Sequence, residues 1–298
     1  MNIWSSFGVG RSLVEAFRFA VQWRVWLLWL VVLAVPAFLG VAPLRGVLAS
    51  ALDHVPESAQ LAQHLSLAQI GDLGAAFADA GGAVSMALLA SFLVVVLLVP
   101  GLASLAMTAA RPQRAPRFGE LVRGSLHEYP RQLRLFLWGA LVYLVALGVY
   151  GGLAYWAEER AARMVLEGSA RHGALLATVV GVIAFVLAHA SLETARAFLV
   201  VRPDDGGALR AWWRAVKLLV RRPGATLGLY LGTLLAGLIV MIIFAIIRVQ
   251  VAPIGWGMVV LAWFLTQMIV MTTAWARVAR LRALAHLAQD EALLRYRN

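Results

Sequence analysis

Residues 223–247 read PGATLGLYLGTLLAGLIVMIIFAII, which is a run of 25 residues without Asp, Glu, Lys or Arg. A helix that crosses the hydrocarbon core of a bilayer needs about 20 mostly apolar residues. Five other runs without these charged residues are about as long or longer. They are residues 25–44, 80–110, 135–157, 173–192 and 249–276. The sequence therefore predicts an all-α polytopic membrane protein with six transmembrane helices.

The composition supports the same class of protein. Hydrophobic residues make up 62% of the 298 residues, charged residues make up 14%, and the mean hydropathy is +0.81. A soluble domain is about half apolar and about a quarter charged, and a disordered chain is far more polar. Cysteine is absent, which excludes disulfides and thiolate zinc sites. Because the first apolar run begins only after Arg24, we expect no cleavable signal peptide.

The distribution of charge predicts the orientation in the membrane. The net charge is +11, and six spans place both termini on one side. The segments expected on that side sum to +13, whereas those on the other side sum to −2. Basic residues accumulate in cytoplasmic loops. We therefore expect an inner (plasma) membrane protein with both termini in the cytoplasm, and its basic charge needs no nucleic-acid partner.

An amphipathic segment with helical spacing precedes the first, third and fifth spans. The apolar positions are Leu13, Ala16, Phe17, Ala20 and Val21, then Phe118, Leu121, Val122, Ser125 and Leu126, then Leu209, Trp212, Trp213 and Val216. Such segments are typical of helices that lie in the headgroup layer. Within one membrane domain of residues 1–298, they predict three tandem units, each an in-plane helix followed by a two-span hairpin. The units are residues 7–110, 117–201 and 206–287.

Two prolines are expected to end these in-plane helices, Pro130 before the third span and Pro223 before the fifth. The alternative to a repeat is chance, because multispan proteins commonly carry basic amphipathic stretches beside their spans.

The order of in-plane segment and hairpin resembles that of a broad group of poorly characterised bacterial six-helix membrane proteins. It is similar to the membrane region fused to some glycerophosphodiester phosphodiesterases. The resemblance covers most of the chain and implies no catalytic residue. A mitochondrial carrier is excluded, because carriers place the in-plane helix inside each hairpin. Carriers also follow the proline of odd spans with an acidic and then a basic residue, whereas Pro36 precedes AFL.

Ionisable groups within spans are costly and are therefore candidates for function. His189, Glu193 and Arg196 share one face of the fourth span, and Glu193 can pair with Arg196. They predict either a proton or substrate site, or an interfacial anchor in which the arginine reaches the headgroups. Gln267 in the sixth span is a candidate for a hydrogen bond between helices or for a ligand contact.

A second candidate site is the basic, aromatic segment before the fifth span. Arg210, Trp212, Trp213 and Arg214 are candidates for binding acidic lipid headgroups. The alternative is an ordinary aromatic belt at the membrane interface. His54 and His64 lie in the longest outer loop, but their spacing matches no known metal-ligand pattern, so we expect neither a metal nor a cofactor.

The sequence lacks a Walker loop, HExxH, GxSxG and a pair of carboxylates within the spans. We therefore expect a non-enzymatic protein that interacts with lipid or serves as an accessory or scaffold component of a membrane complex. Membrane lipids, a partner membrane protein and an ATPase are the candidate partners. The alternative is a transporter or permease subunit for a hydrophobic or lipid-like substrate.

Overall fold

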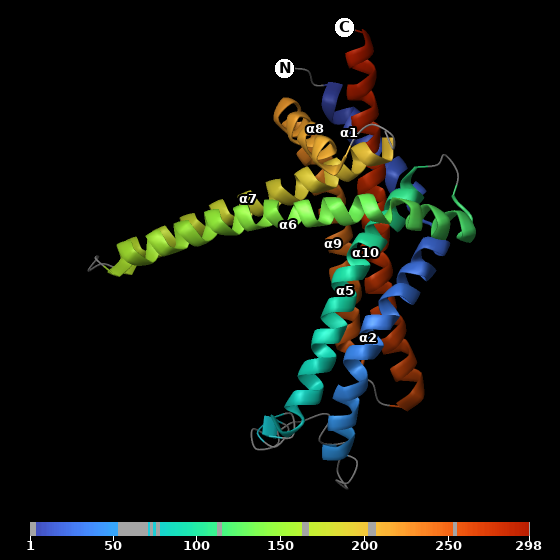
Figure 1. Cartoon of the computed structure of the whole chain (residues 1–298), viewed down its shortest axis with the longest axis vertical. Coiled ribbons are helices and arrows are strands. Elements are labelled where there is room, and N and C mark those ends of the chain that lie inside the picture. The colour runs from blue at the N-terminus through green and yellow to red at the C-terminus, as the bar shows by residue number, and fades with distance from the viewer. Residues whose placement is uncertain are drawn as a thin grey trace. The chain divides into compact units, whose positions relative to one another are not determined.

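The computed structural model describes residues 4–52, 71, 74–75, 78–111, 115–162, 167–201, 207–252 and 255–297. Over these ranges the regular structure consists of eight helices and no strand (Figure 1). The helices are α1 (Trp4–Phe19), α2 (Trp23–Leu52), α5 (Gly81–Ala110), α6 (Phe118–Ala162), α7 (Glu167–Val201), α8 (Ala208–Arg221), α9 (Pro223–Gln250) and α10 (Gly255–Arg297). The loop histidines His54 and His64 lie outside the described residues.

Six of these helices are long and apolar enough to cross a membrane, namely α2, α5, α6, α7, α9 and α10. This confirms the prediction of six long apolar helices and indicates a multi-pass membrane protein. The other two, α1 and α8, have 16 and 14 residues, and each directly precedes a candidate span.

The helix α6 differs from the sequence prediction. It runs without interruption for 45 residues with Pro130 inside it, so the expectation that Pro130 ends a separate amphipathic helix is wrong. A proline within a helix removes one backbone hydrogen bond. Here Leu121 and Glu128 before it, and Gln132 and Leu135 after it, are buried. Packing on both sides of the proline offsets that loss.

Pro223 behaves as expected. The helix α8 ends at Arg221, and Pro223 begins α9, where its missing N–H costs no helical hydrogen bond. Among the described helices, a separate short helix therefore precedes a span ahead of α2 and of α9, but not at the start of α6.

The chain divides into two compact units, and each is described by itself. The smaller unit, residues 27–102, contains most of α2 and α5. In it, Ser91 Oγ donates a hydrogen bond to the Pro36 carbonyl at 2.8 Å. Gly40 faces Ser91 so closely that an added Cβ would lie 3.3 Å from Ser91 Oγ, so the glycine permits this helix contact.

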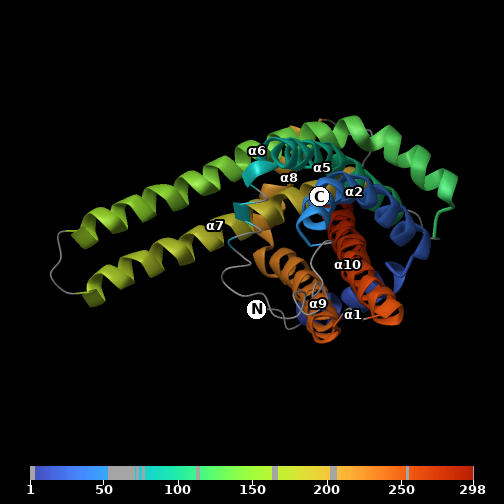
Figure 2. The ribbon, with the colours of Figure 1, turned by 90° about the horizontal axis from the view of Figure 1, so that it is seen from below.

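The larger unit contains residues 1–26 and 103–298, and its core is rich in alanine. In it α6 and α7 run side by side (Figures 1 and 2), and α7 also contacts α10. Most of the alanines with no exposed surface in this unit come from the second half of α7 and from the middle of α10, and the others belong to α5 and α8. Those of α7 and α10 are Ala190, Ala195, Ala197, Ala274, Ala279, Ala283 and Ala288. Small side chains let membrane helices approach closely, which places the core where these helices meet.

Side chains of α10 also bind the ends of other helices of this unit. Trp275 Nε1 donates to the Phe17 carbonyl at 3.1 Å, and Arg282 Nη1 donates to the Ala110 carbonyl at 2.8 Å. The last carbonyls of a helix have no partner within that helix. These two bonds therefore complete the ends of α1 and α5, and they fix both ends to α10.

Candidate functional site

The face predicted on α7 is present, and its charged part is buried. Glu193 is 1% exposed and Arg196 is 7% exposed. Arg196 Nη1 donates to Glu193 Oε1 at 2.6 Å, which is the predicted pair. A second guanidinium comes from α10, where Arg277 Nη2 lies 3.9 Å from Glu193 Oε1. The carboxylate is therefore held between two helices.

His189 lies one turn before Glu193 and joins α7 to two further helices. Its Nδ1 lies 2.8 Å from the hydroxyl of Tyr230 on α9, at hydrogen-bond distance. The ring of Tyr143 on α6 lies 6.5 Å from the His189 ring between centroids. On the other side, the Arg280 guanidinium lies 5.3 Å from the centroid of the Tyr230 ring, within the range of a cation–π interaction.

We define the arginine cluster as Glu193, Arg196, Arg277 and Arg280. It combines three positive charges with one negative charge. Arg280 is 8% exposed and makes no hydrogen bond or ion pair with any residue that the structure describes. The Nε atoms of Arg196 and Arg280 are also buried without an acceptor. Such donors call for a partner, since buried polar groups are almost always hydrogen-bonded.

Gln267 does not belong to this cluster. It lies on α10 ten residues before Arg277, which is about 15 Å along the helix. The structure therefore separates this sequence candidate from the other three.

The sequence analysis missed a second buried carboxylate, Glu128 on α6, which is 1% exposed. Arg111 Nη1 donates to Glu128 Oε1 at 2.9 Å, and Arg131 Nη1 lies 3.6 Å from Glu128 Oε2. Arg111 Nη2 also donates to the Leu199 carbonyl at 3.0 Å near the end of α7. Only the i, i+3 spacing of Glu128 and Arg131 is visible in the sequence, and nothing there indicates burial.

The helix α8 carries the lipid-headgroup candidates, and it separates its two tryptophans. Trp212 Nε1 donates to Ser191 Oγ at 3.1 Å, and its ring meets the edge of Trp138 at 5.4 Å between centroids. Trp213 is 53% exposed, and Lys217 Nζ lies 5.6 Å from its ring centroid. Trp212 therefore packs on α6 and α7, whereas Trp213 remains accessible.

Around its axis, α8 presents three sectors. One sector packs on the protein, one is exposed and apolar, and the sector between them is basic. The packed residues are Ala211, Ala215 and Leu218; the exposed apolar residues are Leu209, Trp213 and Val220; the basic residues are Arg210, Arg214, Lys217 and Arg221. An exposed apolar strip beside a basic strip is typical of a helix that lies in the headgroup layer.

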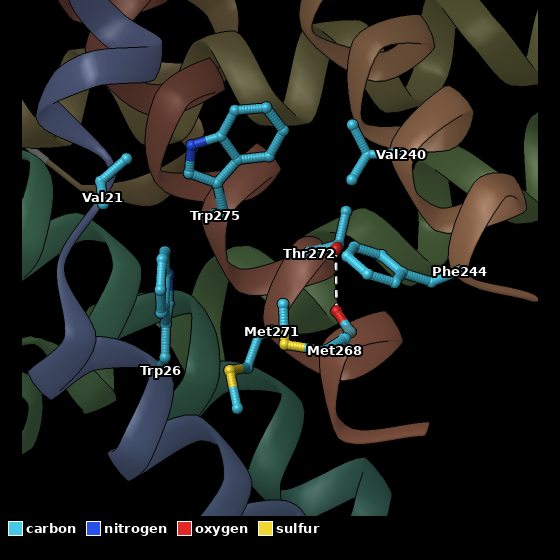
Figure 3. A pocket seen from close by; sticks show the side chains of 8 residues that line it. All are labelled: Val21, Trp26, Val240, Phe244, Met268, Met271, Thr272 and Trp275. Atoms are coloured by element: carbon cyan, nitrogen blue, oxygen red, sulfur yellow. Dashed lines mark hydrogen bonds between the residues drawn. The ribbon is translucent and has the colours of Figure 1, made fainter. Parts of the chain in front are cut away.

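An apolar cavity of about 210 Å³ lies between α9, α10, the segment that joins α1 to α2, and the first turn of α2 (Figure 3). It is lined by Val21, Trp26, Val240, Phe244, Met268, Met271, Thr272 and Trp275. The Thr272 hydroxyl is already bound to the Met268 carbonyl at 2.8 Å. Trp26 Nε1 is buried without an acceptor. Apart from this N–H and the Thr272 hydroxyl, the lining side chains offer mainly apolar surface, so the cavity is suited to a largely apolar ligand that carries one hydrogen-bond acceptor.

The sequence analysis missed this cavity, although its four residues on α10 have the spacing i, i+3, i+4, i+7 of one helical face. Across the described ranges, no three histidine or carboxylate side chains come together as metal ligands would.

Comparison of the chain with known protein families, curated proteins and solved structures finds no match. The function must therefore be argued from the residues of this chain.

Proposed function

We propose that this chain is a non-enzymatic, multi-pass protein of a bacterial inner membrane that binds anionic lipid through α8. Both termini face the cytoplasm in this proposal, which rests on the asymmetry of +13 against −2 between the two sides. The observation that carries the proposal is the surface of α8, where exposed apolar and basic strips lie side by side.

The two strips suit the two layers of a membrane surface. Leu209, Trp213 and Val220 would enter the boundary between headgroups and acyl chains, because each is at least half exposed. The basic side chains would then lie at the level of the lipid phosphates. A Lys or Arg near an anionic membrane surface contributes about 1 kcal/mol of attraction. The basic strip of α8 supplies four such residues, of which Arg221 also lies 3.5 Å from Glu291.

The proposal keeps the three predicted tandem units, but in the second unit the in-plane segment is continuous with the span that follows it. The helices α1 and α8 serve as the in-plane helices of the first and third units, because each is short and directly precedes a span. In the second unit, the corresponding segment is the beginning of α6. A lipid-bound chain of this kind would act as an accessory or scaffold component of a membrane complex, with a membrane protein or an ATPase as its partner.

The test is to count bound lipids by native mass spectrometry after purification in a mild zwitterionic detergent. The double variant Trp213→Ala, Lys217→Gln should retain clearly less phosphatidylglycerol than the unaltered protein. The matched control is Trp263→Ala on α10, because Trp263 is 63% exposed but has no charged residue near it in the sequence. Equal retention in the double variant and in the control contradicts the proposal.

A second candidate function is that of a transporter or permease subunit for a hydrophobic or lipid-like substrate. It is favoured by the cavity of about 210 Å³, which exceeds the roughly 150 Å³ apolar cavity that binds benzene in an engineered protein. In proteoliposomes, transport of an apolar fluorescent probe should fall when Val240→Phe fills this cavity. Transport that is unchanged by this substitution, or no transport at all, contradicts the second candidate.

A further inference from the structure

We propose that the arginine cluster of Glu193, Arg196, Arg277 and Arg280 is a binding site for a phosphate-class oxyanion, with Arg280 as a direct ligand. The anion is either the phosphate of a lipid headgroup or a free phosphate, since both present the same oxygens to a guanidinium. The site is separate from α8, and it stands whether or not α8 binds lipid.

The cluster has an excess of positive charge. Glu193 Oε1 lies 2.6 Å from Arg196 and 3.9 Å from Arg277, and Arg280 acts on the same carboxylate from beyond ion-pair distance. Three guanidinium groups therefore face one carboxylate, and Arg280, which is 8% exposed, forms no close ion pair among the described residues. A buried charge is stable only when it is paired. An oxyanion in contact with Arg280 would supply the missing negative charge.

No other buried carboxylate in the described part of the chain is left to pair with Arg280. In the described part of the chain the buried carboxylates are Glu128, Glu193 and Glu291. Glu128 binds Arg111 at 2.9 Å, and Glu291 lies 3.5 Å from Arg221. The compensating anion therefore comes from outside this set.

The hydrogen-bond donors of the cluster also suit an oxyanion. The Nε atoms of Arg196 and Arg280 are buried without an acceptor. Guanidinium groups bind phosphate through pairs of parallel N–H···O bonds, which a spherical anion such as chloride cannot accept. Several guanidinium groups in one place therefore favour a phosphate-class anion.

The position of Arg280 is held in advance of binding. Its guanidinium lies against the ring of Tyr230, which is 3% exposed, and the Tyr230 hydroxyl is in turn fixed at 2.8 Å from His189 Nδ1. A ligand that meets an ordered side chain loses less free energy in ordering it.

The position of Arg277 and Arg280 along the chain is also consistent with the binding of a phosphate. Arg277 is the first charged residue after the apolar run 249–276, and Arg280 follows one turn later. In the proposed orientation this is the level of the phosphates of the cytoplasmic leaflet. A lipid phosphate or a cytoplasmic phosphate would therefore reach the cluster without crossing the membrane.

The experiment measures the thermal unfolding of the purified protein in a zwitterionic detergent. One series titrates inorganic phosphate against sodium chloride at equal ionic strength, and the other adds phosphatidic acid against phosphatidylcholine. The unaltered protein should gain a few degrees in Tm with one of the two phosphate sources, because a ligand of the folded state stabilises it. Arg280→Met should lose this gain. Arg280→Lys should bind the same anion roughly tenfold more weakly or worse, since it loses the paired hydrogen bonds.

A second readout separates a binding residue from a structural one. Without added phosphate or phosphatidic acid, Arg280→Met should melt at the same temperature as the unaltered protein or higher, because an unpaired buried charge has been removed. The matched control is Arg282→Met on the same helix, since Arg282 is bound to the Ala110 carbonyl at 2.8 Å. This control should melt at a lower temperature and keep its full response to phosphate.

Stabilisation by inorganic phosphate identifies a small-anion site, and stabilisation by phosphatidic acid alone identifies a headgroup site. The proposal is overturned if neither source stabilises the unaltered protein, or if Arg280→Met keeps the full response. It is also overturned if Arg280→Met, without added anion, loses as much stability as Arg282→Met. These outcomes do not depend on Trp213 or Lys217, so a failure of the proposed lipid surface on α8 is recognised separately.

Discussion

Two regions of this protein are rich in basic residues, and they hold those residues differently. On α8, Arg210, Lys217 and Arg221 are exposed, so water or headgroups can solvate their charge. In the arginine cluster, Arg196 and Arg280 are buried beside a single carboxylate, Glu193. The positive-inside rule explains why arginines lie at the ends of spans, but it does not explain why three of them gather around one buried carboxylate when only two lie within ion-pair distance of it. Burial, and not the number of arginines, distinguishes a candidate anion site from a membrane-facing surface.

The largest effect should come from removing the only negative charge of the cluster. Glu193→Gln removes the carboxylate from Arg196, whose side chain is 9% exposed, and from Arg277, whose side chain is 21% exposed. Breaking a buried ion pair by removing one partner costs about 3–5 kcal/mol. The free energy of unfolding in detergent should fall by this amount, whereas it should stay nearly constant in the control Glu158→Gln, since Glu158 is exposed. A Glu193→Gln protein as stable as this control would mean that the cluster is solvated.

Glu128→Gln, the same change at the second buried carboxylate, should lower the free energy of unfolding by a smaller amount. The side chains of its two arginine partners, Arg111 and Arg131, are 26% and 31% exposed, so water can partly replace the lost charge. We expect a loss of about 2 kcal/mol, within the range for a hydrogen bond to a charged group. The same unfolding measurement gives this value. A loss equal to or greater than that of Glu193→Gln would mean that the greater exposure of the arginines at Glu128 does not reduce the cost.

The smallest effect on stability should come from the exposed region. Trp213→Ala on α8 should change the free energy of unfolding by less than about 0.5 kcal/mol, as for most surface substitutions. Its neighbour provides the contrast, because Trp212→Ala removes a hydrogen bond to Ser191 and an aromatic contact with Trp138. The measured free energies of unfolding should therefore differ between the two variants, and Trp212→Ala should be the less stable. Equal losses would mean that both rings pack on the protein.

The sequence predicts the helices well because the signal is local. Length and hydropathy alone indicate six apolar helices, and the structure has six helices with these properties in its described part. The prediction of a break at Pro130 is wrong, since the burial that sustains α6 on both sides of the proline comes from other helices. The continuation of α10 beyond the apolar run to Arg297 does have a local signal, because residues 277–297 are rich in Ala, Leu and Arg, which favour helix.

The candidate site was predictable only in part. The shared face of His189, Glu193 and Arg196 follows from helical spacing within α7. Arg277 and Arg280 join this face from a helix about 80 residues later in the chain, and no sequence pattern links them to Glu193. The outward direction of Trp213 and the inward direction of Trp212 likewise depend on which side of α8 packs against α6 and α7.

Labelling of single cysteines tests most directly the claim that the basic ends of the spans face the cytoplasm. The natural chain contains no cysteine, so one introduced thiol gives an unambiguous signal. In spheroplasts, a membrane-impermeant maleimide should label Glu158→Cys at once, and it should label Arg210→Cys only after the membrane is permeabilised. Labelling of Arg210→Cys in intact spheroplasts would place α8 on the outer side and contradict the orientation on which this account depends.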